Sequence, residues 1–256
     1  MSAVDRADEF VERGYIRIEG AFSADLAATC RDLLWAQLDA RPDDPTTWVE
    51  PVVRLGDQAA PPFGEAANTP ALREAFDLLV GPGRWSPRAS LGTFPVRFPS
   101  DVPAGDDGWH LDASFAAEGE DPSDFFRWRI NLASRGRALL MLFLFSDVGK
   151  DDAPTRIRVG SHLDAARLLA PSGEEGLTMM QISQRAAAVT SAHPVALATG
   201  RAGDVYLCHP FLVHAAQAHH GTRPRFLAQP PLYPARAFDP VAGTSPVELA
   251  IRRALA

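Results

Sequence analysis

The first residues that could carry out chemistry are a histidine and a carboxylate two positions apart, His110 and Asp112. In an extended strand, residues i and i+2 point to the same face, so the imidazole and the carboxylate can converge on one point. A bound cation is the commonest reason for such convergence. The spacing alone fits an ordinary strand with two polar side chains better, so a metal site requires a third ligand and a substrate anchor elsewhere.

Candidates for the third ligand and the anchor follow about a hundred residues later. His214 lies in the apolar segment 211–215, where a lone histidine is usually a core residue bonded to a backbone carbonyl. Arg225 opens a predicted strand, and by itself it fits an edge arginine paired with a surface carboxylate. Taken together, two histidines and one carboxylate on one side of a metal are typical of non-haem Fe(II) oxygenases. The planar guanidinium suits the distal carboxylate of a diacid, because it can bind both oxygens.

The elements that precede these residues are two helices joined by an irregular segment. Residues 23–38 predict an amphipathic helix capped by Ser23. Residues 69–81 predict a second helix, with Thr69 as its cap. Between them, residues 39–68 are rich in Pro, Asp and Gly, and we expect a long loop with little regular structure.

Beyond residue 85 the pattern changes to short strands separated by Gly, Pro and Asp, which favours a sandwich or barrel. We expect one domain over residues 1–256 that is mainly β with flanking helices. In it, residues 1–84 give helical support and residues 85–235 form the β core, interrupted by a helical insertion at about 162–190. The candidate strands are 88–98, 109–115, 127–133, 137–146, 155–159, 195–198, 204–209, 211–215 and 225–229.

The bulk properties exclude several classes of protein. The net charge of −7, from 25 basic and 32 acidic residues, argues against general nucleic-acid binding. The apolar run 138–145 is too short to span a membrane. The first ten residues contain no apolar signal region, so a cytoplasmic location is expected. The two cysteines, Cys30 and Cys208, are far apart in apolar surroundings and are expected to be buried thiols. Nothing in the sequence indicates an oligomeric state.

Five segments, in order, resemble the phytanoyl-CoA dioxygenase family of Fe(II)- and 2-oxoglutarate-dependent oxygenases. In the third segment, Val159 stands where the family usually has proline. No single segment is specific, but their order makes the resemblance strong. The segments are FVERGYIRIEGAFSADLAATCRDLL (10–34), WHLDASF (109–115), DDAPTRIRVGSH (151–162), GDVYLCHPFLVHAA (203–216) and TRPRFLAQ (222–229).

The resemblance implies a distorted double-stranded β-helix, also called a jelly roll or cupin-like fold. It implies that His110, Asp112 and His214 bind Fe(II) and that Arg225 binds 2-oxoglutarate. With O₂, such an enzyme hydroxylates a C–H bond of a small molecule and releases succinate and CO₂. Asp112 argues against a halogenase, because in halogenating relatives a small residue replaces the carboxylate and makes room for the halide.

Other polar residues near these motifs have weaker assignments. Arg97, thirteen residues before His110, either contacts the cosubstrate, as a polar residue does there in some family members, or lies at a solvent-facing rim. Thr155 is a candidate donor to a bound carboxylate. The remaining residues are expected to be structural or solvated: Arg137 as a strand-end charge, His209 in the interior, Arg223 in a turn, and His219 and His220 in a polar loop.

Two other classes of function stay open. The first is a cupin-like metal protein that uses the same ligands for Zn or Mn chemistry without 2-oxoglutarate. Arg225 argues against it, and release of succinate would discriminate. The second is a non-catalytic binding protein on the same fold, which the complete ligand set argues against and absence of metal in the purified protein would favour. The substrate is not predicted, since we expect its pocket to be formed by loops such as 39–68 and 99–108, whose shape does not follow from the sequence.

Overall fold

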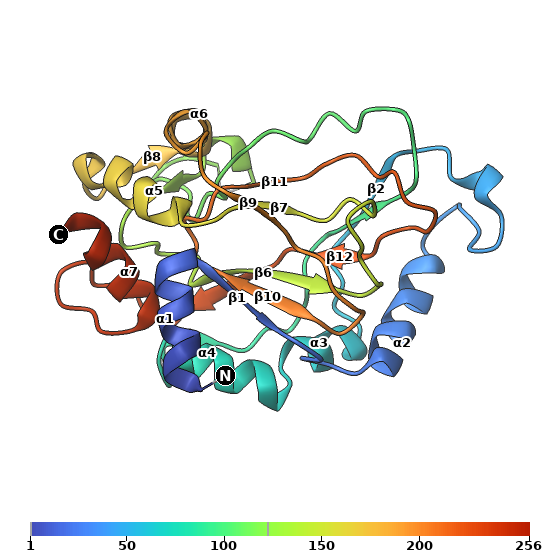
Figure 1. Cartoon of the computed structure of the whole chain (residues 1–256), viewed down its shortest axis with the longest axis horizontal. Coiled ribbons are helices and arrows are strands. Elements are labelled where there is room, and N and C mark those ends of the chain that lie inside the picture. Colours follow the sequence, from blue (N-terminus) through green and yellow to red (C-terminus); the bar gives the residue numbers. More distant parts are fainter. Residues whose placement is uncertain (1, 122) are drawn as a thin grey trace.

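The computed structural model describes residues 2–121 and 123–256. Figure 1 shows a layer with β7, β9 and β11 above a layer with β1, β6, β10 and β12, and helices beneath and beside them.

The helices are α1 (Ala3–Arg13), α2 (Ala24–Trp35), α3 (Pro61–Ala67), α4 (Pro70–Leu79), α5 (Ser161–Leu169), α6 (Met179–Val189) and α7 (Pro246–Leu255), with 3-10 turns η1 (Pro45–Thr47), η2 (Phe125–Arg127) and η3 (Ala170–Ser172). The strands are β1 (Tyr15–Ile18), β2 (Val52–Leu55), β3 (Trp85–Ser86), β4 (Phe94–Arg97), β5 (Arg129–Ile130), β6 (Leu139–Leu144), β7 (Arg156–Arg158), β8 (Leu177–Thr178), β9 (Val195–Leu197), β10 (Val205–Cys208), β11 (His214–Ala215), β12 (Leu227–Ala228) and β13 (Pro231–Pro234).

The larger sheet is built around β6. Its strand order is β1-β10-β6-β13-β3, and β12 also pairs with β6. Every residue of β6 is buried, because the sheet is covered on both faces. Met141 and Phe143 belong to the core shared with the helices, whereas Leu142 and Leu144 belong to a second core on the opposite face. The alternation along one strand therefore serves two separate cores.

The smaller sheet, of order β11-β7-β9, covers the second face of the larger sheet. Ile157 of β7 and Leu227 of β12 belong to the same buried cluster as Leu142 and Leu144, so the two sheets pack face to face. All pairings between named strands are antiparallel in the described part of the chain. This arrangement confirms the predicted β core with flanking helices.

The two helices predicted near the N-terminus are present as α2 and α4. The predicted caps are confirmed, because the hydroxyl of Ser23 accepts a hydrogen bond from the backbone N–H of Leu26, and that of Thr69 accepts one from the N–H of Leu72. The helices end at Trp35 and Leu79, slightly before the predicted ends. They cover the larger sheet with buried side chains that include Cys30.

Three features of the fold differ from the expectations. The prediction of a long loop at 39–68 is wrong, since η1, β2 and α3 lie there and β2 pairs with β4. Its prolines indicated a loop, yet proline in a first helical turn also favours a helix, as in α3. Helix α1 was not predicted, and Phe10 is its only buried residue. Residues 1–84 are not only helical, since β1 pairs with β10 in the larger sheet.

The expected helical insertion at 162–190 contains α5 and α6, joined by η3 and the short strand β8. Helix α7, near the C-terminus, packs against α1 and α5. No helix in residues 2–121 or 123–256 is both long and apolar enough to cross a membrane. Cys30 and Cys208 are buried free thiols, as predicted.

Candidate metal centre

His110 and His214 lie opposite each other on two adjacent segments. The backbone N–H of His110 donates to the carbonyl of His214 at 2.9 Å, and the reverse hydrogen bond measures 3.0 Å. Directly opposite residues in an antiparallel pair project to the same face, and the two ring centroids are 4.4 Å apart. His214 lies in β11, whereas the predicted strand 109–115 is reduced to isolated bridges at His110 and Phe115.

The segment that carries His110 is held by side chains of β7. The ring of Trp109 lies against two guanidinium groups, at 4.8 Å from that of Arg156 and 4.3 Å from that of Arg158. Arg156 also donates to the carbonyls of Asp107 and Ala216, at 2.7 and 2.8 Å. These contacts tie the segment before His110 to the segment after His214, and they replace part of the missing strand pairing.

Each imidazole is oriented by the carbonyl of the residue two positions earlier. Nδ1 of His110 lies 2.8 Å from the carbonyl oxygen of Gly108, and Nδ1 of His214 lies 3.0 Å from that of Leu212. A carbonyl only accepts, so Nδ1 carries the proton in both rings and Nε2 keeps a free lone pair. This is the arrangement in which histidine binds a metal through Nε2.

Asp112 completes a group of three possible ligands. Its Oδ1 lies 3.8 Å from Nε2 of His110 and 3.9 Å from Nε2 of His214. Both distances are shorter than twice a metal–nitrogen bond of about 2.1 Å, so one ion can bridge the three atoms. Within the described residues, this is the group of His, Cys, Asp or Glu side chains that could hold a metal, with ligand atoms within 4.8 Å of one another. Two nitrogens and one carboxylate oxygen form a donor set that Fe(II) uses in oxygenases.

The group is open on one side and closed on the other. The side chains of His110 and Asp112 are 34% and 25% exposed, whereas that of His214 is 3% exposed. Burial, and then the neighbouring His110, lower the pKa of His214 to about 4, so this imidazole is neutral near pH 7. Burial alone would raise the pKa of Asp112, but Arg137 and the two histidines hold it below its ordinary value. His214 and Asp112 are therefore in the protonation states that metal binding requires.

Arg225 points into the same interior space as His214. In β11 and β7, His214 is directly opposite Ile157, so the two side chains share a face. Arg225 precedes Leu227 by two residues and shares its face along the extended chain. Ile157 and Leu227 both lie in the apolar cluster between the two sheets. By this alternation, the predicted metal ligand and the predicted anchor both project toward the apolar cluster between the two sheets.

The guanidinium of Arg225 is buried, and no carboxylate in residues 2–121 or 123–256 forms an ion pair with it. Arg225 is 2% exposed, and it donates to the carbonyls of Ala153 and Pro95, at 2.5 and 3.4 Å. Its Nε finds no hydrogen-bond partner among the described residues. Burial and the neighbouring Arg97 lower the pKa of Arg225 to about 9. A buried cation of this kind is stabilised by an anion bound beside it.

Arg97 lies directly opposite Arg225, with backbone hydrogen bonds of 3.1 and 2.8 Å between them. It is buried, so the solvent-facing rim considered for it in the sequence is excluded. Its Nη2 lies 2.6 Å from Oδ2 of Asp106, which also pairs with Arg54 at 2.5 Å. Asp106 thus balances part of the positive charge, and Arg225 forms no ion pair of its own with the carboxylates of the described residues.

The expectation that His219 lies in a solvated loop is wrong. The residue is 4% exposed, and its Nδ1 accepts from the N–H of Gly221 at 3.1 Å, so Nε2 carries the proton. The carbonyl of Arg223 raises the pKa of this ring but lies outside hydrogen-bond geometry, and Nε2 is without a partner in the described chain. Burial lowers the pKa of His219, and Arg225 and Arg97 act in the same direction. A neutral N–H donor therefore sits near the two arginines.

Thr155 and Arg137 take up positions beside the same space. Thr155 is buried and, by alternation with Ile157, lies on the interior face. Arg137 lies just before β6, at the strand end where it was expected, and its Nη1 also lies 3.1 Å from Oδ2 of Asp112, a contact that was not predicted. No local sequence pattern predicts this contact. A single charged residue before an apolar strand looks the same in the sequence whether its side chain is exposed or pairs with a distant residue. The contacts of Asp106 and His219 are also not visible in the sequence, because both residues lie in polar loops.

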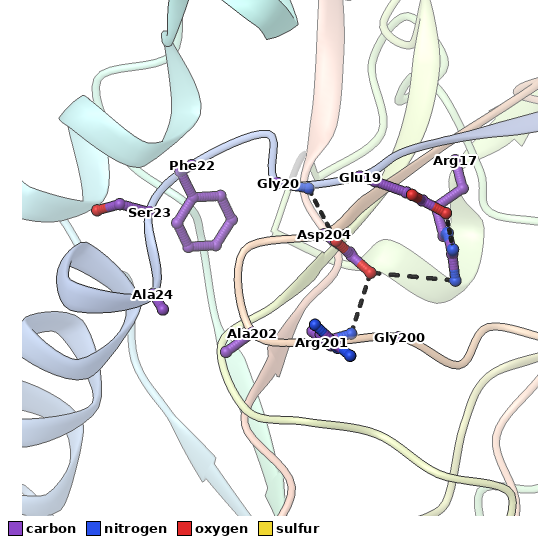
Figure 2. A pocket seen from close by; sticks show the side chains of 10 residues that line it. All are labelled: Arg17, Glu19, Gly20, Phe22, Ser23, Ala24, Gly200, Arg201, Ala202 and Asp204. Atoms are coloured by element: carbon purple, nitrogen blue, oxygen red, sulfur yellow. Dashed lines mark hydrogen bonds and ion pairs between the residues drawn. The ribbon is translucent and has the colours of Figure 1, made fainter. Parts of the chain in front are cut away.

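A separate surface pocket of about 790 Å³ lies at the start of β10, whereas His214 follows the end of that strand. Figure 2 shows that it surrounds the carboxylate of Asp204. This carboxylate accepts from the N–H of Gly20 and of Arg201, and it lies 4.0 Å from Arg17, which also pairs with Glu19. These contacts stabilise the turn before β10. The pocket contains none of the candidate metal ligands.

Comparisons with known proteins agree with this geometry. A family model described as phytanoyl-CoA dioxygenase (PhyH) matches residues 10–227. A search of curated protein sequences finds no significant match. Among solved structures, the epimerase SnoN in complex with Fe³⁺, α-ketoglutarate and nogalamycin RO is 18% identical, with a TM-score of 0.61 over 95% of this chain and 92% of that chain. HygX from Streptomyces hygroscopicus with nickel, 2-oxoglutarate and hygromycin B is 18% identical, with a TM-score of 0.54 over 90% and 87%.

The carbocyclase SnoK from nogalamycin biosynthesis, an α-ketoglutarate-dependent protein, is also similar. It is 18% identical, with a TM-score of 0.51 over 91% of this chain and 86% of that chain. At these identities the likeness shows the shared fold, the jelly roll that the sequence predicted. The family match covers most of the chain and includes all three candidate ligands and Arg225. The chain belongs to the phytanoyl-CoA dioxygenase family.

Proposed function

We propose that this protein is an Fe(II)- and 2-oxoglutarate-dependent dioxygenase that oxidises a small molecule. The observation that carries the proposal is the group formed by His110, Asp112 and His214, in which both Nε2 lone pairs face one carboxylate oxygen. Its donor set fits Fe(II), and its exposed side admits other molecules. Family membership and the metal-bound, 2-oxoglutarate-bound structures of SnoN and HygX support the assignment.

The chain's own residues hold the reactants in place. We assign the distal carboxylate of 2-oxoglutarate to Arg225, supported by the buried guanidinium that pairs with no carboxylate in the part of the chain that the structure describes. Arg97 contributes a second positive charge, and His219 a neutral N–H donor, at the same place. We assign Thr155 as a further hydroxyl donor on the interior face. The apolar side chains between the sheets exclude water around these groups, which strengthens their electrostatic attraction for an anion.

When bound, Fe(II) with 2-oxoglutarate and O₂ supplies an oxidant strong enough to attack a C–H bond, with release of succinate and CO₂. The role of His110, Asp112 and His214 is to bind the metal on one side and leave the remaining positions open. We propose hydroxylation as the outcome. Asp112 supports it over halogenation, because its carboxylate occupies the place that a halide would need.

The substrate enters, in this proposal, from the side on which His110 and Asp112 are exposed. SnoN and HygX were solved with nogalamycin RO and hygromycin B, which supports a small-molecule substrate here. We place the enzyme in the cytoplasm, since a reducing compartment suits both Fe(II) and the free thiols of Cys30 and Cys208.

The test is incubation of the protein with Fe(II), 2-oxoglutarate and a library of small metabolites under air, with succinate as the readout. We expect succinate to rise above the substrate-free level for one class of compound, and the product to gain one oxygen atom by mass spectrometry. Loss of two hydrogens would instead indicate cyclisation or desaturation, and an unchanged mass would indicate epimerisation, as the name of SnoN suggests for that protein. A protein that binds no Fe(II), or binds it and never consumes 2-oxoglutarate, would contradict the proposal and favour the binding-protein or cupin-like alternative.

A further inference from the structure

Arg137 is placed where it can control how Asp112 binds a metal. It lies two residues before β6, and its side chain is 12% exposed. Its Nη1 lies 3.1 Å from Oδ2 of Asp112, and its Nη2 donates to the carbonyl of Ala113 at 3.4 Å. The guanidinium therefore spans the side chain of the candidate ligand and the backbone that follows it.

The two oxygens of Asp112 have different surroundings. Oδ1 is the atom that lies 3.8 and 3.9 Å from the Nε2 atoms of His110 and His214. Oδ2 is the atom that lies against Arg137, on the other side of the carboxylate. One oxygen thus faces the position of a metal, and the other is held by a cation that would itself be repelled by the metal.

This difference affects the number of ligand positions that stay open. A carboxylate can bind a metal through one oxygen or through both. Through one oxygen, the three side chains occupy three positions of an octahedral ion, which leaves two for a chelating 2-oxo acid and one for O₂. Through both oxygens, Asp112 would take the position that O₂ needs. The structure favours the first mode, because Oδ2 already has a charged partner.

We propose that Arg137 is a positioning residue that keeps Asp112 bound to the metal through Oδ1 alone, so that the position for O₂ stays open. The inference rests on the proposed function. It assigns to Arg137 a role that a surface ion pair would not have, since exposed pairs contribute little to stability or geometry. Nε and Nη1 of Arg137 find no hydrogen-bond partner in the described chain, so the contact of Nη1 with Oδ2 of Asp112 is an ion pair.

The experiment uses nitric oxide as a stable substitute for O₂. The anaerobic wild-type protein is loaded with Fe(II) and 2-oxoglutarate, and nitric oxide is titrated while the electron paramagnetic resonance signal of its iron adduct is followed. In Arg137→Gln, loss of a charge-assisted contact should lower the nitric oxide affinity by about tenfold or more. The affinity for 2-oxoglutarate should stay unchanged, because two positions remain for it. Arg137→Lys should recover part of the loss, since an ammonium keeps the charge without the planar fork.

Arg135→Gln is the matched control, because Arg135 lies in the same loop, is 50% exposed and pairs with Glu174 at 3.6 Å. It should bind nitric oxide like the wild type. Arg137→Met, which removes the charge of the guanidinium and adds no new polar group, carries the same expectation as Arg137→Gln if the latter does not fold. Wild-type nitric oxide affinity in a folded Arg137→Gln or Arg137→Met protein would overturn this inference alone. A wild-type protein that gives no nitric oxide signal with Fe(II) and 2-oxoglutarate would overturn the proposed function as well.

Discussion

Truncation of Arg225 tests the proposed cosubstrate site most directly. In Arg225→Ala, the distal carboxylate of 2-oxoglutarate would enter an enclosed space without the guanidinium that balances it. Arg225 is 2% exposed, so the range for a buried pair applies rather than the small values of exposed pairs. Removing one partner of a buried pair costs about 2–5 kcal/mol, which corresponds to a rise of roughly 30- to several-thousand-fold in the dissociation constant. Because Arg97 remains as a second cation, we expect the lower half of this range.

The assay is a titration of 2-oxoglutarate into the anaerobic Fe(II) protein, followed by the metal-to-ligand charge-transfer absorption. Fe(II) binding should be nearly unchanged, since Arg225 is not among the metal ligands. Arg225→Lys should recover part of the affinity, because an ammonium cannot reproduce the two-pronged contact. Arg223→Ala is the control: Arg223 is exposed, and its loss should have a small effect. If Arg223→Ala weakens 2-oxoglutarate binding and Arg225→Ala leaves it intact, the assignment of the anchor is refuted.

Three further predictions concern the metal, His219 and acid stability. His110→Ala, Asp112→Ala and His214→Ala should each lose stoichiometric Fe(II) binding and turnover while keeping the circular dichroism of the wild type; Fe(II) affinity retained in all three would place the site elsewhere. His219→Phe should weaken 2-oxoglutarate binding by roughly tenfold in the same titration, the loss expected for one hydrogen bond to a charged group; unchanged affinity would exclude His219 from the site. Burial lowers the pKa of His162 from 6.5 to about 4, so the unfolded chain takes up a proton first as the pH falls. The free energy of unfolding should therefore fall between pH 6.5 and 4, by up to about 1.4 kcal/mol per pH unit from this residue; urea unfolding of His162→Phe should show a shallower pH slope, and an equal slope would contradict the assignment.

Several features of the fold and site were predictable because they depend on neighbours in the chain. The convergence of His110 and Asp112 follows from the two-residue period of extended chain. The starts of α2 and α4 follow from Ser23 and Thr69, since a cap satisfies N–H groups of the first turn only. The buried strand β6 follows from an uninterrupted apolar run, which needs cover on both faces. His214 and Arg225 were identified because the segments that contain them follow His110 and Asp112 in the same order as in the family.

Other features were decided only by tertiary structure. Arg137 reaches Asp112, and Asp106 pairs with Arg97, through loops whose paths no periodic pattern specifies. His219 is buried because its loop folds back beside the strands, although its neighbours in the sequence are polar. A charged or polar side chain has the same local sequence signature whether it ends in water or against a buried partner. Its surroundings are set by contacts between distant segments, and the pKa values and open positions of the metal centre follow from those contacts.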